Sequence, residues 1–484
     1  MTEIAFRSAT ELAATVRQRE ISSRELLDLY VERIERYDPV LNAVVVRRYE
    51  EARQRAEAAD AATAAGEEWG PLHGVPMTIK EAFDWVGTPT TRGLVRLADN
   101  YPETNAEVVD SLLGAGAVIF GKTNVPALLA DWQSFNDVSG TTSNPWDPNL
   151  VPGGSSGGSA AALAAGLTGL ELGSDIGGSI RNPAHYCGVF GHKPTMGLVS
   201  NRGPDRPGQH ASSDMSVIGP MARSTTDLEV TLDVIAGPSK LDRRGWHLDL
   251  PTPPRRAPSD WRVAVMLDSP CCAQDDELTE HLLGVVDSLR DLGMHVDEAA
   301  RPSVDMERAH HVFWLLLRAA TGVHTSDEEY DSHELGVAAW EQGDRSYRAY
   351  ADRGTTLTHR EWFQLHDERE RMRLAWADFF EGFDLLLCPA AASTAFPHDH
   401  EGERPERTII VSGRSEPAPD QLFWAGISST VYLPSTVAPV GLTRSGMPCG
   451  VQIIAPYLRD RDSLAFARLI EGELGGFITP PGYE

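Results

Sequence analysis

The segment GSDIGGSIRN (173–182) decides how the rest of the chain is interpreted. In it, Ser179 follows two glycines and stands two residues before Arg181, shortly after the apolar run LAAGLTGLEL (163–172). Glycine weakens a strand or a helix, so two glycines beside one hydroxyl indicate a backbone that approaches something closely or forms an unusual turn. The rest of the sequence has to show whether the backbone at these glycines approaches a substrate or only a neighbouring strand.

Composition excludes several classes of protein. The 484 residues can fill a large core, and the formal net charge of −27 disfavours binding to nucleic-acid phosphates or anionic membranes. The five cysteines include an adjacent pair and have no zinc-binding spacing, so we expect neither a secreted disulfide framework nor a structural metal. The N-terminus lacks an apolar signal segment and no apolar run could span a membrane, which predicts a cytoplasmic protein.

Helical and strand patterns follow one another along the chain. The segments SATE (8–11) and SSRE (22–25) are capping-box patterns, and the second begins an amphipathic helix that is expected to end before Pro39. Further on, the strand pattern AVIFG (117–121) follows a helix, and GGSAAALAAG (157–166) has the composition of a tightly packed helix. This alternation indicates an α/β sheet with helices on its faces.

We expect four regions within a single domain. They are a helical region packed on the core (1–65), a core that carries the glycine-rich segments (66–240), a variable helical or α/β region near a pocket mouth (241–380), and strands with a closing helix (381–484).

Three segments carry the candidate chemistry. They are LHGVPMTIKEAFD (72–84) with Lys80, VPGGSSGGSAAALAAG (151–166) with Ser155 and Ser156, and the segment that contains Ser179. GGSSGG lacks the Lys-Ser/Thr ending of a P-loop and GSDIGG lacks dinucleotide-binding spacing, which disfavours a nucleotide site. Any one of the segments alone is better explained by glycines that allow close packing of strand and helix.

Together these segments resemble the amidase signature family, which carries a Ser–Ser–Lys triad. GKTNVP (121–126), IGPMARSTTDL (218–228) and LPSTVAPVGLTRSGMPCGVQIIAP (433–456) also match, in the family order. The resemblance covers nearly the whole chain and is weakest at about 240–380. It implies a large mixed, mostly parallel β-sheet covered by helices on both faces, and a hydrolase without a metal or organic cofactor.

By this resemblance Ser179 matches the nucleophile, Lys80 the base, and Ser155 a bridging serine reached through a cis peptide bond. Ser156 matches a second serine beside the triad. A serine hydroxyl is a weak nucleophile that needs a positioned base, and a lysine serves as one only when burial lowers its pKa. Apolar neighbours such as Met77 and Ile79 would desolvate Lys80, and Ser155 would relay the proton.

The glycines have a function in the same scheme. In a tight turn, the backbone N–H groups of Ile176, Gly177, Gly178 and Ser179 converge on the substrate carbonyl oxygen and form an oxyanion hole. Side chains at positions 177 and 178 would block the approach of the substrate.

Other reactive residues near these segments are weaker candidates. Histidines close to Ser179 in sequence rarely fold back onto that hydroxyl, and a buried cysteine is most often a packed small residue. Asp175 and Arg181 are expected to form an ion pair that holds the loop. The candidates set aside in this way are His185, His192, Cys187, Lys122 and Lys193, of which Lys122 is the only serious competitor of Lys80.

The segment ALLADWQSF (127–135) departs from the resemblance, because many family members carry small residues there that line the acyl side of the pocket. Leu129, Asp131 and Trp132 are therefore candidates for substrate contact, with packing of the loop as the equal alternative. Asp131 would either recognise an amine-bearing substrate or face solvent.

The resulting hypothesis is an amidohydrolase that cleaves a small linear amide, or a carbamate or aryl ester, through an acyl-Ser179 intermediate. One alternative is the glutamine-hydrolysing component of a tRNA-dependent amidotransferase, although 303–430 shows no confident match to the Arg/Asp pair of that branch. Another is a binding protein on an amidase scaffold, which would not require Lys80, Ser155 and Ser179 together. Family members often form homodimers, but no segment shows an interface.

Overall fold

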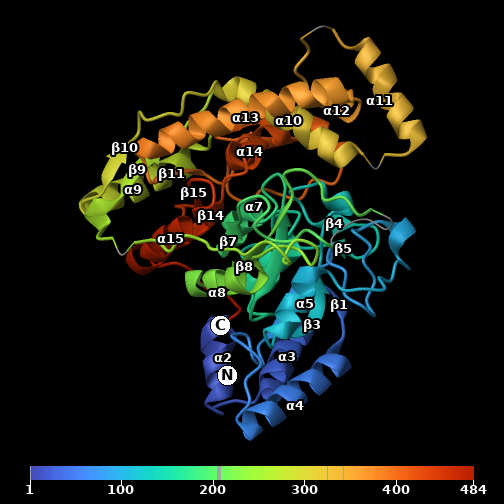
Figure 1. The fold of residues 1–484 in the computed structure, drawn as a ribbon, viewed down its shortest axis with the longest axis vertical. Coiled ribbons are helices and arrows are strands. Elements are labelled where there is room, and N and C mark those ends of the chain that lie inside the picture. Colours follow the sequence, from blue (N-terminus) through green and yellow to red (C-terminus); the bar gives the residue numbers. More distant parts are fainter. Residues whose placement is uncertain (1, 204–208, 255, 324, 342) are drawn as a thin grey trace.

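The computed structural model describes residues 2–203, 209–254, 256–323, 325–341 and 343–484. Helices from the N-terminus form one end of the molecule, where the C-terminus also lies (Figure 1). They are α1 (Thr2–Ala5), α2 (Ala9–Arg17), α3 (Ser23–Leu41) and α4 (Tyr49–Ala65). The two expected capping boxes are confirmed, with Ser8 and Ser22 as the N-caps of α2 and α3.

Helix α3 differs from the expectation at its C-terminal end, because it continues through Pro39 to Leu41. The backbone N–H of Asn42 donates to the Asp38 carbonyl at 2.6 Å, and the Asp38 carboxylate accepts the N–H of Ala43 at 2.6 Å. These bonds stabilise the last turn despite the N–H that proline lacks. The expected end before Pro39 was wrong.

A three-stranded sheet positions the candidate base. Its strands lie in the order β1 (Val44–Arg47), β3 (Val118–Thr123) and β2 (Pro76–Lys80), and α5 (Glu107–Gly114) leads into β3. Strands β2 and β3 run parallel, with Lys80 opposite Thr123. Every residue of β2 is buried, as expected for a strand covered on both faces.

A larger mixed sheet has the strand order β10-β9-β11-β15-β14-β7-β8-β6. In chain order its strands are β6 (Glu171–Asp175), β7 (Phe190–Lys193), β8 (Val217–Ala222), β9 (Arg262–Val265), β10 (His295–Asp297), β11 (Leu385–Pro389), β14 (Ser435–Leu442) and β15 (Pro448–Ile454). The mixed α/β fold is confirmed, but the expectation of mostly parallel strands needs correction: only the pairs β9–β10 and β9–β11 run parallel among the described strands of this sheet. One reason is that a short turn joins β14 to β15, and such a turn forces its strands to run antiparallel.

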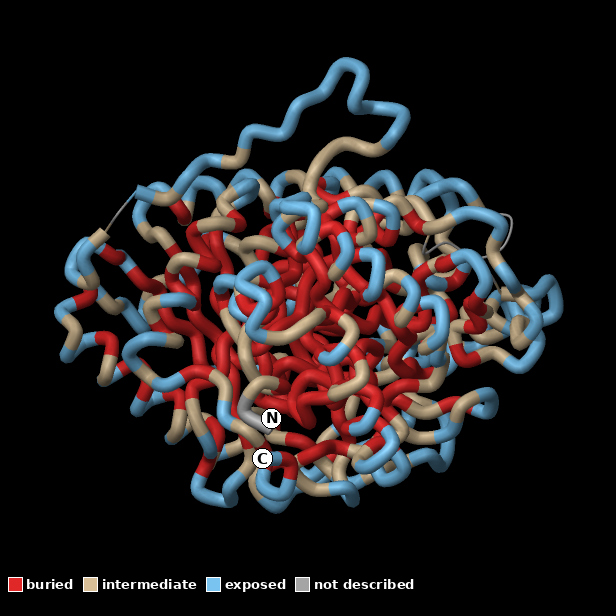
Figure 2. The backbone as a smooth tube through the Cα atoms, turned by 90° about the horizontal axis from the view of Figure 1, so that it is seen from below, coloured by how far each residue is buried: buried red, intermediate tan, exposed pale blue. Residues whose placement is uncertain are grey.

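Buried residues fill the interior of the molecule, and exposed residues lie around its outside (Figure 2). α6 (Gly157–Ala164), α7 (Arg181–Cys187), α8 (Thr225–Ile235), α9 (Asp276–Asp291) and α15 (Asp460–Leu474) belong to the central part of the fold. At the end opposite the N-terminal helices lie α10 (Met306–Gly322), α11 (Asp327–Ala339), α12 (Tyr347–Thr355) and α13 (His359–Gly382), with α14 (Leu422–Thr430) beneath them (Figure 1). Two hairpins complete the fold: β4 (Phe135–Asn136) with β5 (Gly140–Thr141), and β12 (Thr408–Val411) with β13 (Arg414–Pro417).

Within the described ranges, no helix combines the length and the apolar composition that a membrane crossing requires.

Candidate active site

Lys80 is the last residue of β2 and is fully buried, as are Met77 and Ile79 beside it. Its Nζ donates to Ser155 Oγ at 2.7 Å and to Ser174 Oγ at 2.9 Å. Burial lowers the pKa of the Lys80 amine to about 7, while the negative charge of Asp175 acts in the opposite direction. The amine is therefore available in its neutral form near neutral pH.

The candidate serines Ser155 and Ser179 lie in two segments that contact each other. The peptide bond from Gly154 to Ser155 is cis, and Ser156 follows directly as the residue before α6. The backbone N–H of Ser156 donates to the Ser179 carbonyl at 3.1 Å, which holds the Ser155 segment against the Ser179 turn. Ser179 is 6% exposed, and no hydrogen bond joins its hydroxyl to that of Ser155 among the described residues.

Asp175 and Arg181 hold the Ser179 turn from inside the protein. Their side chains form a buried ion pair with Arg181 Nη2 and Asp175 Oδ1 2.8 Å apart. Burial alone would raise the pKa of the Asp175 carboxyl, but the charge and hydrogen bonds of Arg181 outweigh it and lower that pKa. Arg181 also donates to Ala425 O, Ser428 Oγ, Ser429 Oγ and Gln452 Oε1.

The backbone of the turn corrects the expected oxyanion hole at one position. The N–H of Gly178 donates to Asp175 Oδ1 at 2.8 Å and is therefore already engaged within the protein. For the N–H groups of Ile176, Gly177 and Ser179, the described part of the chain supplies no acceptor. These three donors remain candidates for a substrate oxygen.

The two glycines before Ser179 differ in their surroundings. Gly178 has φ +91°, and a Cβ there would lie 2.8 Å from Trp132 Cζ2. At Gly177 the nearest atom to a Cβ would be Leu422 Cδ2 at 3.6 Å, an ordinary contact distance. Trp132 packs against the Gly178 side of the turn and donates its indole N–H to the Gly177 carbonyl at 2.9 Å. Gly178 is thus required by backbone conformation and packing, whereas a Cβ at Gly177 would make only ordinary contacts with neighbouring side chains.

Comparison with known proteins identifies the family. The family model named Amidase matches residues 25–464, nearly the whole chain. The chain belongs to the amidase signature family. It is 30% identical to fatty-acid amide hydrolase 2 of Homo sapiens, over 98% of this chain and 90% of that protein. It is 32% identical to an indoleacetamide hydrolase of Bradyrhizobium diazoefficiens, over 97% of this chain and 86% of that protein.

Other relatives of this amidase differ in function. The chain is 33% identical to a component of the glutamyl-tRNA(Gln) amidotransferase of Acidothermus cellulolyticus, over 95% of this chain and 93% of that protein. A solved amidase structure is 27% identical and superposes with a TM-score of 0.78, covering 97% of this chain and 100% of the other. Amidase signature enzymes hydrolyse carbon–nitrogen bonds of small amides, so this general activity is supported.

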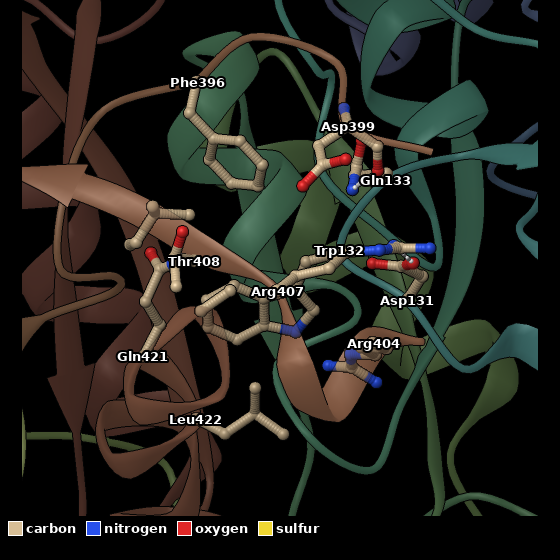
Figure 3. Close-up of a pocket in the computed structure, with 12 residues that line it drawn as sticks. Asp131, Trp132, Gln133, Phe396, Asp399, Arg404, Arg407, Thr408, Gln421 and Leu422 are labelled. Atoms are coloured by element: carbon tan, nitrogen blue, oxygen red, sulfur yellow. Dashed lines mark hydrogen bonds and ion pairs between the residues drawn. The ribbon is translucent and has the colours of Figure 1, made fainter. Parts of the chain in front are cut away.

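In the structure of this chain, the residues of the 127–135 segment differ from one another in their surroundings. Trp132 is buried against the Ser179 turn, and Leu129 is half-buried with φ +60°. Asp131 neither faces solvent nor stands ready for an amine, because its carboxylate is 2.5 Å from Arg407 Nη1 (Figure 3). A contact of Leu129 or Trp132 with substrate stays a prediction.

The residues set aside in the sequence have partners away from the two serines. His185 bonds to the Ser393 carbonyl and to the Gly450 N–H, and His192 bonds to Thr436 and Asp460. Two other lysines are also buried: Lys122 donates to Pro89 O and Thr90 Oγ1, and Lys193 donates to the carbonyls of Pro194 and Leu433. Burial lowers their pKa values to about 8 and about 7, respectively. In the described residues, no cluster of three His, Cys, Asp or Glu could hold a metal ion.

Sequence reasoning missed Ser174, whose hydroxyl accepts a hydrogen bond from Lys80 Nζ. A signal was available, because Ser174 is a polar residue on a buried strand directly before Asp175. It also missed Leu422, which comes from α14 and lies beside Gly177. No local pattern marks that residue, since its place depends on how α14 packs.

Proposed function

We propose that this chain is a serine amidohydrolase that cleaves a linear amide, or a related carbamate or aryl ester, through an acyl intermediate on Ser179. The observation that carries the proposal is the 2.7 Å hydrogen bond from Lys80 Nζ to Ser155 Oγ inside a buried site. A serine nucleophile needs a positioned base, and a lysine with a pKa of about 7 provides a neutral amine at neutral pH. The relatives named as hydrolases of fatty-acid amides and of indoleacetamide support the choice of bond.

In this mechanism Ser179 Oγ attacks the carbonyl carbon of the substrate. Its proton passes to Ser155 Oγ while the proton of Ser155 passes to Lys80 Nζ. The carbonyl oxygen gains negative charge and accepts bonds from the N–H groups of Ile176, Gly177 and Ser179, each worth roughly 3 kcal/mol in the transition state. The carbon–nitrogen bond then breaks, and the leaving amine takes the proton back by the same route. Water attacks the acyl-Ser179 ester, which releases the acid and restores the hydroxyl.

The experiment is labelling with a fluorophosphonate, followed by peptide mass spectrometry to locate the adduct. We expect the adduct on Ser179, its loss in Ser179→Ala, and a labelling rate roughly 100-fold or more lower in Lys80→Met. Lys122→Met is the matched control, because Lys122 is also buried but donates to no serine of the site. Absence of an adduct in the wild-type chain, or one that ignores Lys80, would contradict the mechanism.

The amidotransferase alternative rests on the 33% identity to the Acidothermus cellulolyticus protein. Under this alternative the chain would release ammonia from glutamine within a complex. The bulky 127–135 segment argues against it, since Trp132 occupies the side of the turn where small residues are expected. Hydrolysis of an aryl amide by the purified chain, without activity on glutamine, would exclude it.

A further inference from the structure

An open groove lies between α10, α12 and η5 (Ala418–Gln421), the short helix that precedes α14. It belongs to the end of the molecule opposite the N-terminal helices (Figure 1). Its volume is about 670 Å³, within the range of pockets that bind small molecules. Tyr347, Tyr350, His310 and Asp420 are among the side chains that line it. Aromatic rings and a carboxylate that face one groove are typical of a site for an organic cation.

The two tyrosine rings of the groove are held by packing on Trp314. The centroid of the Trp314 ring lies 4.6 Å from that of Tyr347 and 6.3 Å from that of Tyr350. The centroids of the two tyrosine rings are 6.1 Å apart, and both Trp314 and Tyr350 are buried. Tyr347 is half-buried, so part of its side chain is accessible from the groove. Because these rings are fixed before a ligand arrives, their contact with a ligand costs little conformational entropy.

Asp420 supplies a carboxylate without a cationic partner. It accepts a hydrogen bond from the Tyr347 hydroxyl, and no Lys, Arg or His nitrogen of the described residues lies within 4.0 Å of it. Burial raises the pKa of the Asp420 carboxyl, the bond from Tyr347 lowers it, and the negative charge of Glu416 raises it again. A carboxylate that is partly withdrawn from water beside another acid is unfavourable, so a positively charged ligand would stabilise it.

The other ionisable groups of the groove do not compensate Asp420. Burial lowers the pKa of His310 to about 4 and raises that of the Cys271 thiol, so both side chains are neutral at neutral pH. The remaining charged side chains that line the groove each have an oppositely charged neighbour: Glu307 with Arg345, Arg407 with Asp131, and Glu406 with Arg348 at 3.8 Å. The groove therefore retains one negative charge that no described side chain balances.

The groove adjoins the turn that carries Ser179. Arg407 and Thr408 line both the groove and a smaller pocket that contains Trp132 (Figure 3). Trp132 in turn donates its indole N–H to the carbonyl of Gly177, two residues before Ser179. Through these shared residues the groove lies next to the pocket beside the turn. The far end of a substrate held at Ser179 can therefore occupy the groove.

We propose that this groove binds an organic ammonium group through the rings of Tyr347 and Tyr350 and the carboxylate of Asp420, and that the amide hydrolysed at Ser179 carries this group. The binding site stands on the groove alone, whereas its assignment to the substrate rests on the proposed function. An aromatic face attracts a cation through its quadrupole, and a carboxylate adds the opposite charge. A divalent metal ion would need roughly six oxygen ligands, and the described ranges contain no cluster of three His, Cys, Asp or Glu.

The first measurement is the binding of choline and of 3,3-dimethylbutan-1-ol to the purified full chain, followed by ligand-observed NMR titration. The two compounds have nearly the same shape, and only choline is charged. We expect the Kd of choline to be at least about tenfold below that of the alcohol, and Asp420→Asn and Tyr347→Leu should each raise it at least about fivefold. Asp287→Asn is the control, because Asp287 is an exposed aspartate on α9, outside the groove.

The second measurement uses p-nitroanilides of acids that end in a trimethylammonium group, with about two to eight methylene groups before it, each paired with its neutral tert-butyl analogue. A second series carries the same end groups on the leaving amine, and hydrolysis is followed by chromatography. We expect one length to give a kcat/KM at least about tenfold above that of its neutral partner. Asp420→Asn and Tyr347→Leu should remove most of this preference by raising KM, while kcat/KM for the neutral amide stays within about twofold.

The outcomes separate the two proposals. If choline binds no better than the alcohol, or if both groove variants leave its Kd unchanged, the ammonium site is overturned and the amidohydrolase remains. If choline binds in the groove but no charged amide of either series is preferred, the assignment of the ammonium group to the substrate is overturned. If Ser179 is not labelled at all, the proposed function itself fails, and choline binding still decides the ammonium site. Labelling of Ser179 in Asp420→Asn and Tyr347→Leu shows that these variants have folded.

Discussion

The pH dependence of Ser179 labelling tests the central inference most directly, because it reports the protonation of Lys80 in the free protein. Burial lowers the pKa of Lys80 from its ordinary value of 10.5 to about 7. About a tenth of the amine is then neutral at pH 6 and about nine-tenths at pH 8, whereas a lysine of ordinary pKa would be neutral in roughly one molecule in 3000 at pH 7. The labelling rate should therefore increase nearly tenfold per pH unit below pH 6 and become level above pH 8.

The assay is the second-order rate constant for fluorophosphonate labelling between pH 5 and pH 9.5, with the intact fold checked at each pH by circular dichroism. Lys193→Met is the decisive control, since Lys193 also has a pKa of about 7 but donates to backbone carbonyls away from the serines. The profile should survive in that variant and vanish in Lys80→Met. A rate that keeps rising to pH 9.5, or that loses its dependence on pH in Lys193→Met, would refute the assignment of Lys80 as the base.

Other changes have separate expected outcomes. Gly178→Ala should destabilise the fold by about 1–3 kcal/mol in urea denaturation, because of its φ of +91° and the Trp132 ring at 2.8 Å. Gly177→Ala should change the free energy of unfolding by no more than about 1 kcal/mol, since the atom nearest to the added Cβ is at 3.6 Å. It should nevertheless slow amide hydrolysis at least tenfold, because the methyl group lies beside Ser179. Equal stability losses in the two glycine variants would contradict this contrast. Trp132→Phe removes the 2.9 Å hydrogen bond to the Gly177 carbonyl, which should raise the free-energy barrier to labelling by about 1 kcal/mol and slow labelling roughly fivefold. An unchanged labelling rate would show that the turn is held without that bond. Between about pH 7 and pH 10.5, Lys193 binds fewer protons in the folded than in the unfolded chain. The free energy of unfolding should therefore rise with pH across this window. The slope should be steeper in wild type than in Lys193→Met, by up to about 1.4 kcal/mol per pH unit. Parallel slopes for the two proteins would show that the folded pKa of Lys193 is not lowered.

Those residues of the candidate site that lie in local sequence motifs could be predicted from the sequence. Lys80, Ser155 and Ser179 stand in segments rich in glycine and small residues, which together are typical of one kind of site, and the structure places Lys80 beside Ser155. The contacts that could not be predicted join distant parts of the chain. Asp131 and Arg407 are 276 positions apart, and nothing in either segment marks the other as its partner. An acidic side chain in a loop therefore looks solvent-exposed in the sequence although it is paired in the fold.

The strand directions and the oxyanion donors were mispredicted for a related reason. The family resemblance implied mostly parallel strands, but strand direction depends on which strands become neighbours, and β14 with β15 forms an antiparallel hairpin. Likewise, four consecutive N–H groups looked equivalent, until the Asp175 carboxylate folded back onto Gly178. Hydrogen-bond competition within one turn is a property of three-dimensional geometry that residue types alone do not specify.

The hydrogen bonds of Arg181 set the time at which a newly made chain can complete the Ser179 turn. Its guanidinium lies among groups from Asp175, from α14, and from Gln452, which is 271 positions further along the chain. At synthesis rates of about 5–20 residues per second, the ribosome reaches Gln452 on the order of tens of seconds after Arg181. During that interval the nascent chain already contains Lys80, Ser155 and Ser179, but the arginine that anchors the turn lacks most of its acceptors. Translation thus separates the appearance of Lys80, Ser155 and Ser179 from the completion of the turn that Arg181 anchors, and a chain that ends before α14 would lack the acceptors that α14 and Gln452 supply to this arginine.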